Sequence, residues 1–595
     1  MDGAKFNVQQ FPISFILGSI EAGQIAIPEI QRPFVWDSTK VRDLIDSLYR
    51  GYPIGYIILW QNPDVMTKEG KKAHGKKIVI DGQQRIIALS AAILGNEIIN
   101  KNFHRINITI AFNPLQEKFE VLNSIISKDS SWIPNISVVI KNGANLFNIV
   151  KDYCKKNDTS EEVIFNKLSK LSQIKTLQIG VIDLAYELDI ETVTEIFIRI
   201  NSQGVILNQA DFAMSKIAAD TKYDGQNLRK CIDYFCHMAV NPEFYFNIKD
   251  IDKNFTETEY FPKIAWLKNE IDDLYDPTYL DLLRVAFTYE FNRGVLSDLV
   301  SLLSGRNFET KSYEERIIEE SFSKLKKGVL TSVNENNFKN FVMIIKSAGY
   351  TSSSLITSQN ALNFAYILYL KLKSLGYKEI QTHSPVRKWF LLSSLTGRYS
   401  ASTESNFDSD IKQISSRDFM EFLKLTEEAE LSESFWNVAL VQNLNTSGTG
   451  NPYFNAFLAS QIKAQDEGFV SPSFSVNSLV NVKGDIHHIF PRDYLKKNDY
   501  TKTQYNQVAN YAIIHPSINV MIGNKPPKQY LNEIKEKIQR GDTDTFKSEN
   551  ELLKNLEMNC VTEDIFEMDA KNYEEFLENR RKLMAKKIKD FYLSL

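Results

Sequence analysis

The chain has 595 residues, of which 43% are hydrophobic and 12% aromatic, so it can bury several cores and roughly two to four domains are expected. A formal net charge of −4 argues against a protein that coats DNA over its whole surface, but not against a nuclease, because local charge steers binding. Four scattered cysteines exclude a disulfide framework and predict a reducing, cytoplasmic compartment. The sequence predicts neither a signal peptide nor a membrane span.

Residues 77–94 predict a strand, a tight turn and a helix. The strand is Lys77 to Ile80, the turn is the Asp-Gly-Gln-Gln-Arg segment 81–85, and an apolar helical pattern follows over 86–94. Such a turn presents free backbone N–H groups, usually to an anion. The side chains of Gln83, Gln84 and Arg85 add donors that suit phosphate or a base edge. An arginine in a surface turn is more often simply solvated.

Two further polar blocks flank this segment in the sequence. The first, residues 27–37, places Gln31 and Arg32 before a helix that Asp37 or Ser38 would cap. The second, residues 197–204, ends a helix on a polar glycine turn that contains Arg199 and Asn201. Taken singly, a capped helix and a surface turn explain both blocks.

In this order the three blocks resemble the ParB/sulfiredoxin-like domain at the N-terminus of GmrSD-type, modification-dependent restriction and phage-defence proteins. The resemblance covers about residues 10–220. It implies binding or hydrolysis of a nucleoside triphosphate, GTP or ATP, without a Walker-type loop, which the sequence lacks. The residues that it implies for this site are Gln31, Arg32, Asp81, Gly82, Gln83, Gln84, Arg85, Arg199 and Asn201.

The middle of the chain is predicted to be largely helical, with the clearest linker at residues 443–452. Cys231, Cys236 and His237 lack the spacing of a zinc site and indicate a helix with buried thiols. The block at 387–400 mixes basic and aromatic residues, which is compatible with either helix packing or DNA contact.

The segment Asp485–Pro491 places two of the seven histidines side by side. Neighbouring residues of a strand point to opposite faces, so one histidine could hold a metal ion while the other takes a proton from water. Asn510 precedes a short apolar strand at 511–514, and Asn519 follows nine residues later, where a helix could begin. A bare histidine pair could equally well end an ordinary strand.

This spacing resembles the HNH, or ββα-metal, nuclease motif. Carried over position by position, the resemblance makes His487 a metal ligand, His488 the general base and Asn519 the second ligand. It makes Asn510 the residue that orients the imidazole of His488. The ligands suit Mg²⁺ or Mn²⁺, and ligand type alone leaves zinc open. Many members have an acid at the position of His487, which leaves the identity of the metal open. His515 is a further candidate, although a histidine before a proline in a turn is more often solvated.

The sequence therefore predicts an α+β multidomain protein. Residues 1–220 would form the ParB-like nucleotide-binding domain, 221–450 a helical middle domain, and 451–595 an HNH-type nuclease domain with a helical tail. The predicted function is an NTP-regulated, metal-dependent endonuclease that restricts modified double-stranded phage DNA, with a homodimer as one possible assembly. Two alternatives stay open: a nucleotide-gated DNA-binding regulator with an inactive HNH module, and an HNH ribonuclease toxin.

Overall fold

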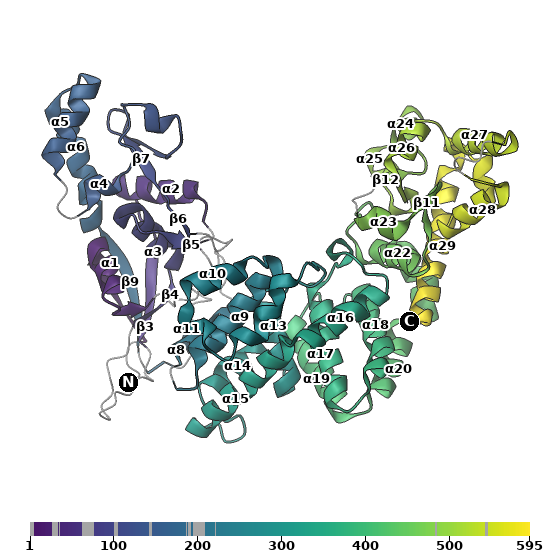
Figure 1. Cartoon of the computed structure of the whole chain (residues 1–595), viewed down its shortest axis with the longest axis horizontal. Helices are drawn as coiled ribbons and strands as arrows, with labels where there is room; N and C mark the ends of the chain where they lie inside the picture. Colours follow the sequence, from purple (N-terminus) through teal and green to yellow (C-terminus); the bar gives the residue numbers. More distant parts are fainter. Residues whose placement is uncertain are drawn as a thin grey trace. The chain divides into compact units, whose positions relative to one another are not determined.

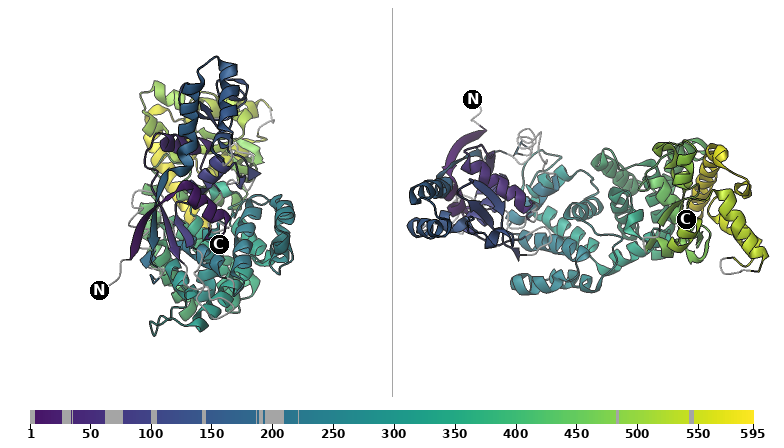
Figure 2. Two further views of the ribbon diagram at one scale, coloured as in Figure 1. Left: turned by 90° about the vertical axis from the view of Figure 1, so that its left-hand side faces the viewer. Right: turned by 90° about the horizontal axis from the view of Figure 1, so that it is seen from above.

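The computed structural model divides into two compact units, Met1–Gln226 and Asn227–Leu595 (Figure 1 and Figure 2). The residues that it describes are 5–26, 34, 36–61, 77–99, 105–141, 145–185, 187–188, 192–193, 209–220, 222–481, 485–541 and 546–595. Helices dominate and the sheets are small, so the predicted α+β class with a helical middle is confirmed. None of the described helices has the length and apolar character that spanning a membrane requires.

The first unit is built on a five-stranded mixed sheet with the order β1-β9-β3-β4-β2. The β1–β9 and β3–β4 pairs are antiparallel, whereas β9–β3 and β4–β2 are parallel. The bounds are β1 (Phe6–Pro12), β9 (Gln178–Leu184), β3 (Tyr56–Gln61), β4 (Lys77–Asp81) and β2 (Ile25–Ala26). The central strand β3 is apolar over most of its length because it is covered on both faces, and Ile57 and Ile58 are almost completely buried.

Helices of the first unit cover this sheet and form its core. The side chain of Asp37 accepts a hydrogen bond of 2.8 Å from Lys40 N, so the predicted cap is present. The core joins side chains of the sheet to those of the helices, for example Val41, Ile86 and Val181. The principal helices are α1 (Ile13–Glu21), α2 (Ser38–Tyr49), α3 (Gln83–Leu89), α5 (Leu146–Asn157) and α6 (Glu161–Ser172).

The helical part of the second unit packs around one central helix, α17 (Gln359–Ser374). Every residue from Ala361 to Leu370 is buried, as expected of a helix that is apolar on all sides. Helices α13, α16, α18 and α19 contact it. The other long helices are α9 (Gly225–Val240), α13 (Tyr279–Phe291), α15 (Glu315–Ser332), α16 (Glu335–Ser347), α18 (Glu379–Thr396), α19 (Thr403–Ser416) and α20 (Phe419–Glu430).

Two predictions for this helical part are resolved. Cys231 and Cys236 are buried thiols on α9, as expected. In the block 387–400, Trp389 is fully buried and its Nε1 donates to Tyr399 Oη over 3.0 Å. Arg398 forms a two-pronged ion pair with Asp410, which is 2% exposed. Trp389, Arg398 and Tyr399 of this block therefore serve helix packing, and DNA contact by its other residues stays a prediction.

The C-terminal part of the same unit begins with α22 (Pro452–Lys463), which Asn451 caps. A Cβ atom on Gly349 would lie 2.1 Å from Ala459 O, so the turn after α16 can cross α22 only because it carries a glycine. The elements that follow are β10 (Glu467–Gly468), β11 (Ser471–Ser475), α23 (Val476–Asn481), β12 (Asp485–His488), β13 (Tyr511–Ile514), α26 (Pro516–Ile522), α27 (Pro527–Gln539), α28 (Glu549–Met558) and α29 (Tyr573–Ser594).

Candidate functional site

The histidine pair lies on an antiparallel hairpin of β12 and β13. His487 is opposite Ala512 and His488 is opposite Tyr511. Helix α26, which carries Asn519, follows β13 and contacts β12. The order strand, strand, helix that the spacing predicts is therefore present, and it brings β12, which carries His487 and His488, into contact with α26, which carries Asn519.

The two histidines have different surroundings. His487 is 6% exposed, whereas His488 is only partly buried, as expected for neighbours that point to opposite faces of a strand. The ring of His488 lies edge-on to that of Tyr511, with centroids 5.0 Å apart. Burial lowers the pKa of His488, and its hydrogen bond to Asn506 offsets this only in part. A neutral imidazole that can accept a proton is therefore the favoured form.

Asn510 makes no hydrogen bond to the imidazole of His488. Its buried Oδ1 accepts from Phe490 N over 2.8 Å, and its Nδ2 donates to the carbonyls of Phe490 and Tyr505 over 3.1 and 3.2 Å. The group that meets His488 Nε2, at 2.9 Å, is Asn506 Oδ1. The expectation that Asn510 orients the ring directly is therefore wrong, because the loop between β12 and β13 returns with Asn506 beside the histidine. Asn510 instead fixes the backbone two residues after His488.

A buried arginine from the last helix supports the same hairpin. Arg580 on α29 is 1% exposed and donates to Ala509 O over 2.9 Å and to Tyr511 O over 2.7 Å. Two further hydrogen bonds reach Asn559 O. Burial lowers the pKa of Arg580 to about 10, so the group stays charged near neutral pH. Nothing in the sequence pattern points to it, because it lies far along the chain from the histidine motif.

The predicted metal ligands lie on adjoining elements, His487 on β12 and Asn519 on α26. Among the described residues, no group of three or more His, Cys, Asp or Glu side chains could hold a metal ion. The two ligands that the motif implies, one imidazole and one amide, would leave most of a cation's shell to water, which suits Mg²⁺. His515 caps α26: its Nδ1 lies 2.8 Å from Ser517 Oγ, and its ring stacks on Phe474.

The N-terminal turn has the predicted form, a strand, a glycine and a helix. Gly82 has φ +94°, in the left-handed region, directly before α3. Arg85 donates to Tyr56 O and lies 3.7 Å from the carboxylate of Asp81, while Gln83 Nε2 donates to Val79 O over 3.1 Å. These side chains brace the turn. The other candidates for this site, Gln31, Arg32, Arg199 and Asn201, lie outside the described residues, so the nucleotide site stays a prediction.

Replacing Gly82 by alanine is expected to destabilise this turn by about 2–3 kcal/mol. The new Cβ would add strain at a positive φ and lie only 3.1 Å from Ile57 Cγ1 and 3.2 Å from Ile57 Cα. Gly51→Ala is the matched control, because Gly51 has φ +75° with open space around it, and it should lose only about 1 kcal/mol. Hydrogen exchange of residues 56–94 in increasing urea measures both. Equal losses of stability in the two variants would show that Ile57 can shift to accommodate the new Cβ atom at no cost.

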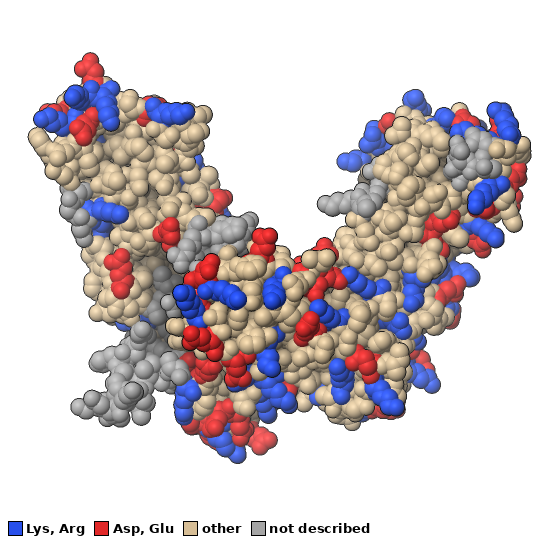
Figure 3. All heavy atoms as spheres, viewed as in Figure 1, with Lys and Arg blue, Asp and Glu red and all other residues tan. Residues whose placement is uncertain are grey.

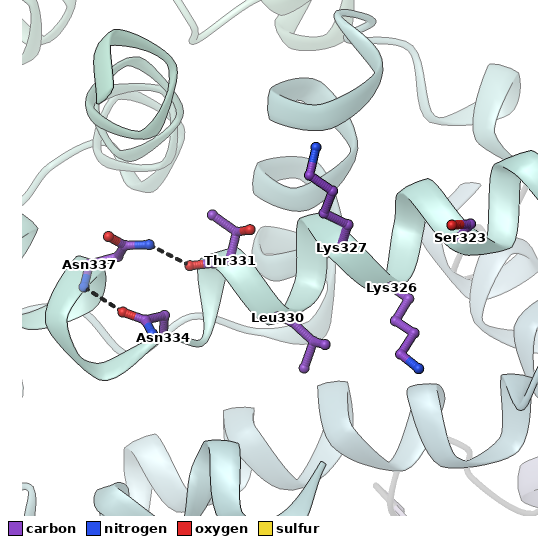
Figure 4. A pocket seen from close by; sticks show the side chains of 7 residues that line it. All are labelled: Ser323, Lys326, Lys327, Leu330, Thr331, Asn334 and Asn337. Atoms are coloured by element: carbon purple, nitrogen blue, oxygen red, sulfur yellow. Dashed lines mark hydrogen bonds between the residues drawn. The ribbon is translucent and has the colours of Figure 1, made fainter. Parts of the chain in front are cut away.

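Two surface hollows lie in the described part of the second unit, and neither contains a predicted site residue. One, of about 410 Å³, is lined along α15 and the start of α16 (Figure 4). Its lysines, Lys326 and Lys327, pair with Glu259 and Glu290. The other, of about 650 Å³, lies between the end of α16 and β11 and includes Lys463. Basic and acidic side chains are interspersed over the helical part (Figure 3), so charge alone marks no binding face in that view.

A known protein family and a known protein resemble this chain, the first in its N-terminal part and the second over nearly its whole length. Residues 13–218 match the N-terminal domain of the GmrSD restriction endonuclease. An uncharacterised protein of Methanocaldococcus jannaschii is 22% identical over 95% of this chain and 96% of its own length. The resemblance of the three N-terminal blocks is therefore confirmed. The family match ends before the hairpin of His487 and His488, so the role of the hairpin is argued from its own geometry.

Proposed function

We propose that the protein, whose residues 13–218 match the N-terminal domain of the GmrSD restriction endonuclease, is a metal-dependent DNA endonuclease that restricts modified foreign DNA. DNA cleavage would take place at the β12–β13 hairpin. The observation that carries this assignment is the half-buried His488, whose pKa burial lowers. The residue before it on β12 is the buried His487. A helix that carries Asn519 lies against the same strand.

In this mechanism His488 takes a proton from the attacking water and so generates the nucleophile beside the phosphodiester. A Mg²⁺ or Mn²⁺ ion held by His487 and Asn519 would supply electrophilic stabilisation of the phosphate oxygens. Asn510 and Arg580 act one layer further out, because they fix the backbone on which His488 and Tyr511 lie. Positioning of this kind matters because a base misplaced by about 1 Å can lose about 100-fold in rate.

The first unit would bind or hydrolyse GTP or ATP and license cleavage. The supporting feature is the turn at Gly82, which places the first backbone N–H groups of α3 at the end of β4, where a phosphate group could be bound. Asp81, Gln83, Gln84 and Arg85 would hold the turn or contact the nucleotide. A restriction role on double-stranded phage DNA, in the cytoplasm and as a homodimer, completes the proposal.

The test is cleavage by the purified full-length protein in Mg²⁺ or Mn²⁺, with and without GTP or ATP. The substrates are plain plasmid and glucosylated, hydroxymethylated and phosphorothioated DNA. Cutting is expected only of modified DNA, and His488→Ala should lower the rate about 10²–10⁴-fold, the usual contribution of a general base. His383→Ala, which changes a histidine on α18, should cut normally.

Other outcomes would replace the proposal. Equal cutting of all DNAs would leave an endonuclease without a sensor for modification. Cleavage of RNA but not of DNA would indicate a ribonuclease toxin. DNA binding without cleavage under every condition would identify a nucleotide-gated regulator.

A further inference from the structure

We propose that Asn506 is a positioning residue of the nuclease site, whose side-chain oxygen holds the imidazole of His488 in one tautomer and one orientation. The inference rests on the proposed function in that His488 is taken as the general base. It goes beyond the motif, because Asn506 is not one of the four residues that the resemblance carries over.

The contact itself fixes the tautomer. Asn506 Oδ1 lies 2.9 Å from His488 Nε2, and an amide oxygen can only accept a hydrogen bond. Nε2 must therefore carry the hydrogen, and in a neutral imidazole Nδ1 then carries the lone pair. The geometry thus selects Nδ1 as the atom that receives the proton from water.

The ring of His488 is also held on its other sides. Tyr511, opposite it on β13, lies edge-on at 5.0 Å, and Tyr505 lies at 6.3 Å between ring centroids. Aromatic edges restrict rotation of the ring without providing a second hydrogen-bond partner. Asn506 is therefore the group that determines which ring nitrogen of His488 is hydrogen-bonded within the protein.

Asn506 lies on an anchored turn. Its backbone N–H donates to Lys502 O over 3.2 Å, which closes the short helix Lys502–Tyr505. The preceding carbonyl, Tyr505 O, accepts from Asn510 Nδ2 over 3.2 Å and from Tyr573 Oη over 3.3 Å. The position of Asn506 is therefore linked through buried groups to β13 and α29. Partners of this kind, one layer behind the reacting group, commonly change activity by about 10–100-fold when they are removed.

The activity test compares two substitutions of similar size. Asn506→Leu removes the acceptor, whereas Asn506→Asp keeps an oxygen in its place. Both are assayed on the DNA that the wild-type full chain cuts, at about pH 8.5, where an ordinary histidine is neutral. For Asn506→Leu we expect kcat to fall about 10–100-fold with KM and DNA affinity unchanged, and for Asn506→Asp to recover to within about threefold of wild type. Asn498→Leu, an exposed asparagine of the same loop, is the control and should cut normally.

A spectroscopic test covers the case in which no DNA is cut. In full-length protein labelled with ¹⁵N-histidine, the His488 signals, assigned by their loss in His488→Ala, should show hydrogen on Nε2 in the wild type. Asn506→Leu should show a mixture of tautomers. Absence of cleavage together with this spectrum would sink the nuclease proposal and keep the positioning role. An unchanged spectrum or an unchanged kcat in Asn506→Leu would overturn the inference about Asn506.

Discussion

Asn510→Ala is expected to slow cleavage by roughly 100-fold or more while most of the second unit stays folded. The substitution removes three hydrogen bonds and leaves Phe490 N, Phe490 O and Tyr505 O to find other partners in a buried site. Each such loss costs about 1–3 kcal/mol, so the loop between β12 and β13 should be destabilised by about 3–5 kcal/mol. Because His488 directly precedes this loop, a shift of the loop misplaces the general base, and a loss of about 100-fold or more in the cleavage rate follows.

Two companion variants separate the role of Asn510 from a general effect on the loop. Asn510→Asp can still accept from Phe490 N but cannot donate to the two carbonyls, so it should fall between wild type and alanine. Asn498→Ala, which alters an exposed asparagine bonded only locally to Tyr494 O, should be neutral. Hydrogen exchange of residues 485–514 together with the cleavage rate measures the series. Unchanged protection in Asn510→Ala would refute the role of Asn510 in holding the loop.

The parts of the site that the sequence predicted are those set by short-range pattern. An apolar run, a glycine and a helical period over residues 77–94 suffice to predict β4, a tight turn at Gly82 and the helix that follows. In the same way, residues 485–522 contain their own strand, strand and helix signals, and the alternation along β12 predicts that His487 and His488 face opposite sides.

Side-chain partners at long range could not be predicted. Asn506 and Asn510 are four residues apart in one loop, and only the path of that loop decides which of them meets His488. The sequence predicts that the guanidinium of Arg85 donates to a ligand. In the fold, one of its N–H groups instead donates to Tyr56 O on β3. Arg580 lies 71 and 69 positions from Ala509 and Tyr511, two of the residues whose carbonyls it binds. Neither composition nor spacing predicts such tertiary contacts.

Arg580 makes the most far-reaching of these contacts, and Arg580→Met is expected to destabilise the C-terminal part of the second unit by about 3–5 kcal/mol. Methionine fills much of the volume but leaves the carbonyls of Ala509, Tyr511 and Asn559 without the donors that Arg580 supplies. Release of the buried charge offsets part of this loss, because burial already lowers the pKa of the group to about 10. The unsatisfied carbonyls should dominate, since one side chain serves all three.

The test of Arg580 is urea unfolding of the full chain, followed by hydrogen exchange of residues 505–514 and 555–595. Arg580→Lys should recover only part of the stability, because an ammonium group cannot match the planar fork that reaches three carbonyls at once. Arg581→Met is the matched control: this neighbour is partly exposed and bonds only Asn445, so less than about 1 kcal/mol should be lost. If Arg580→Met were as stable as Arg581→Met, the hairpin would not depend on the hydrogen bonds of Arg580.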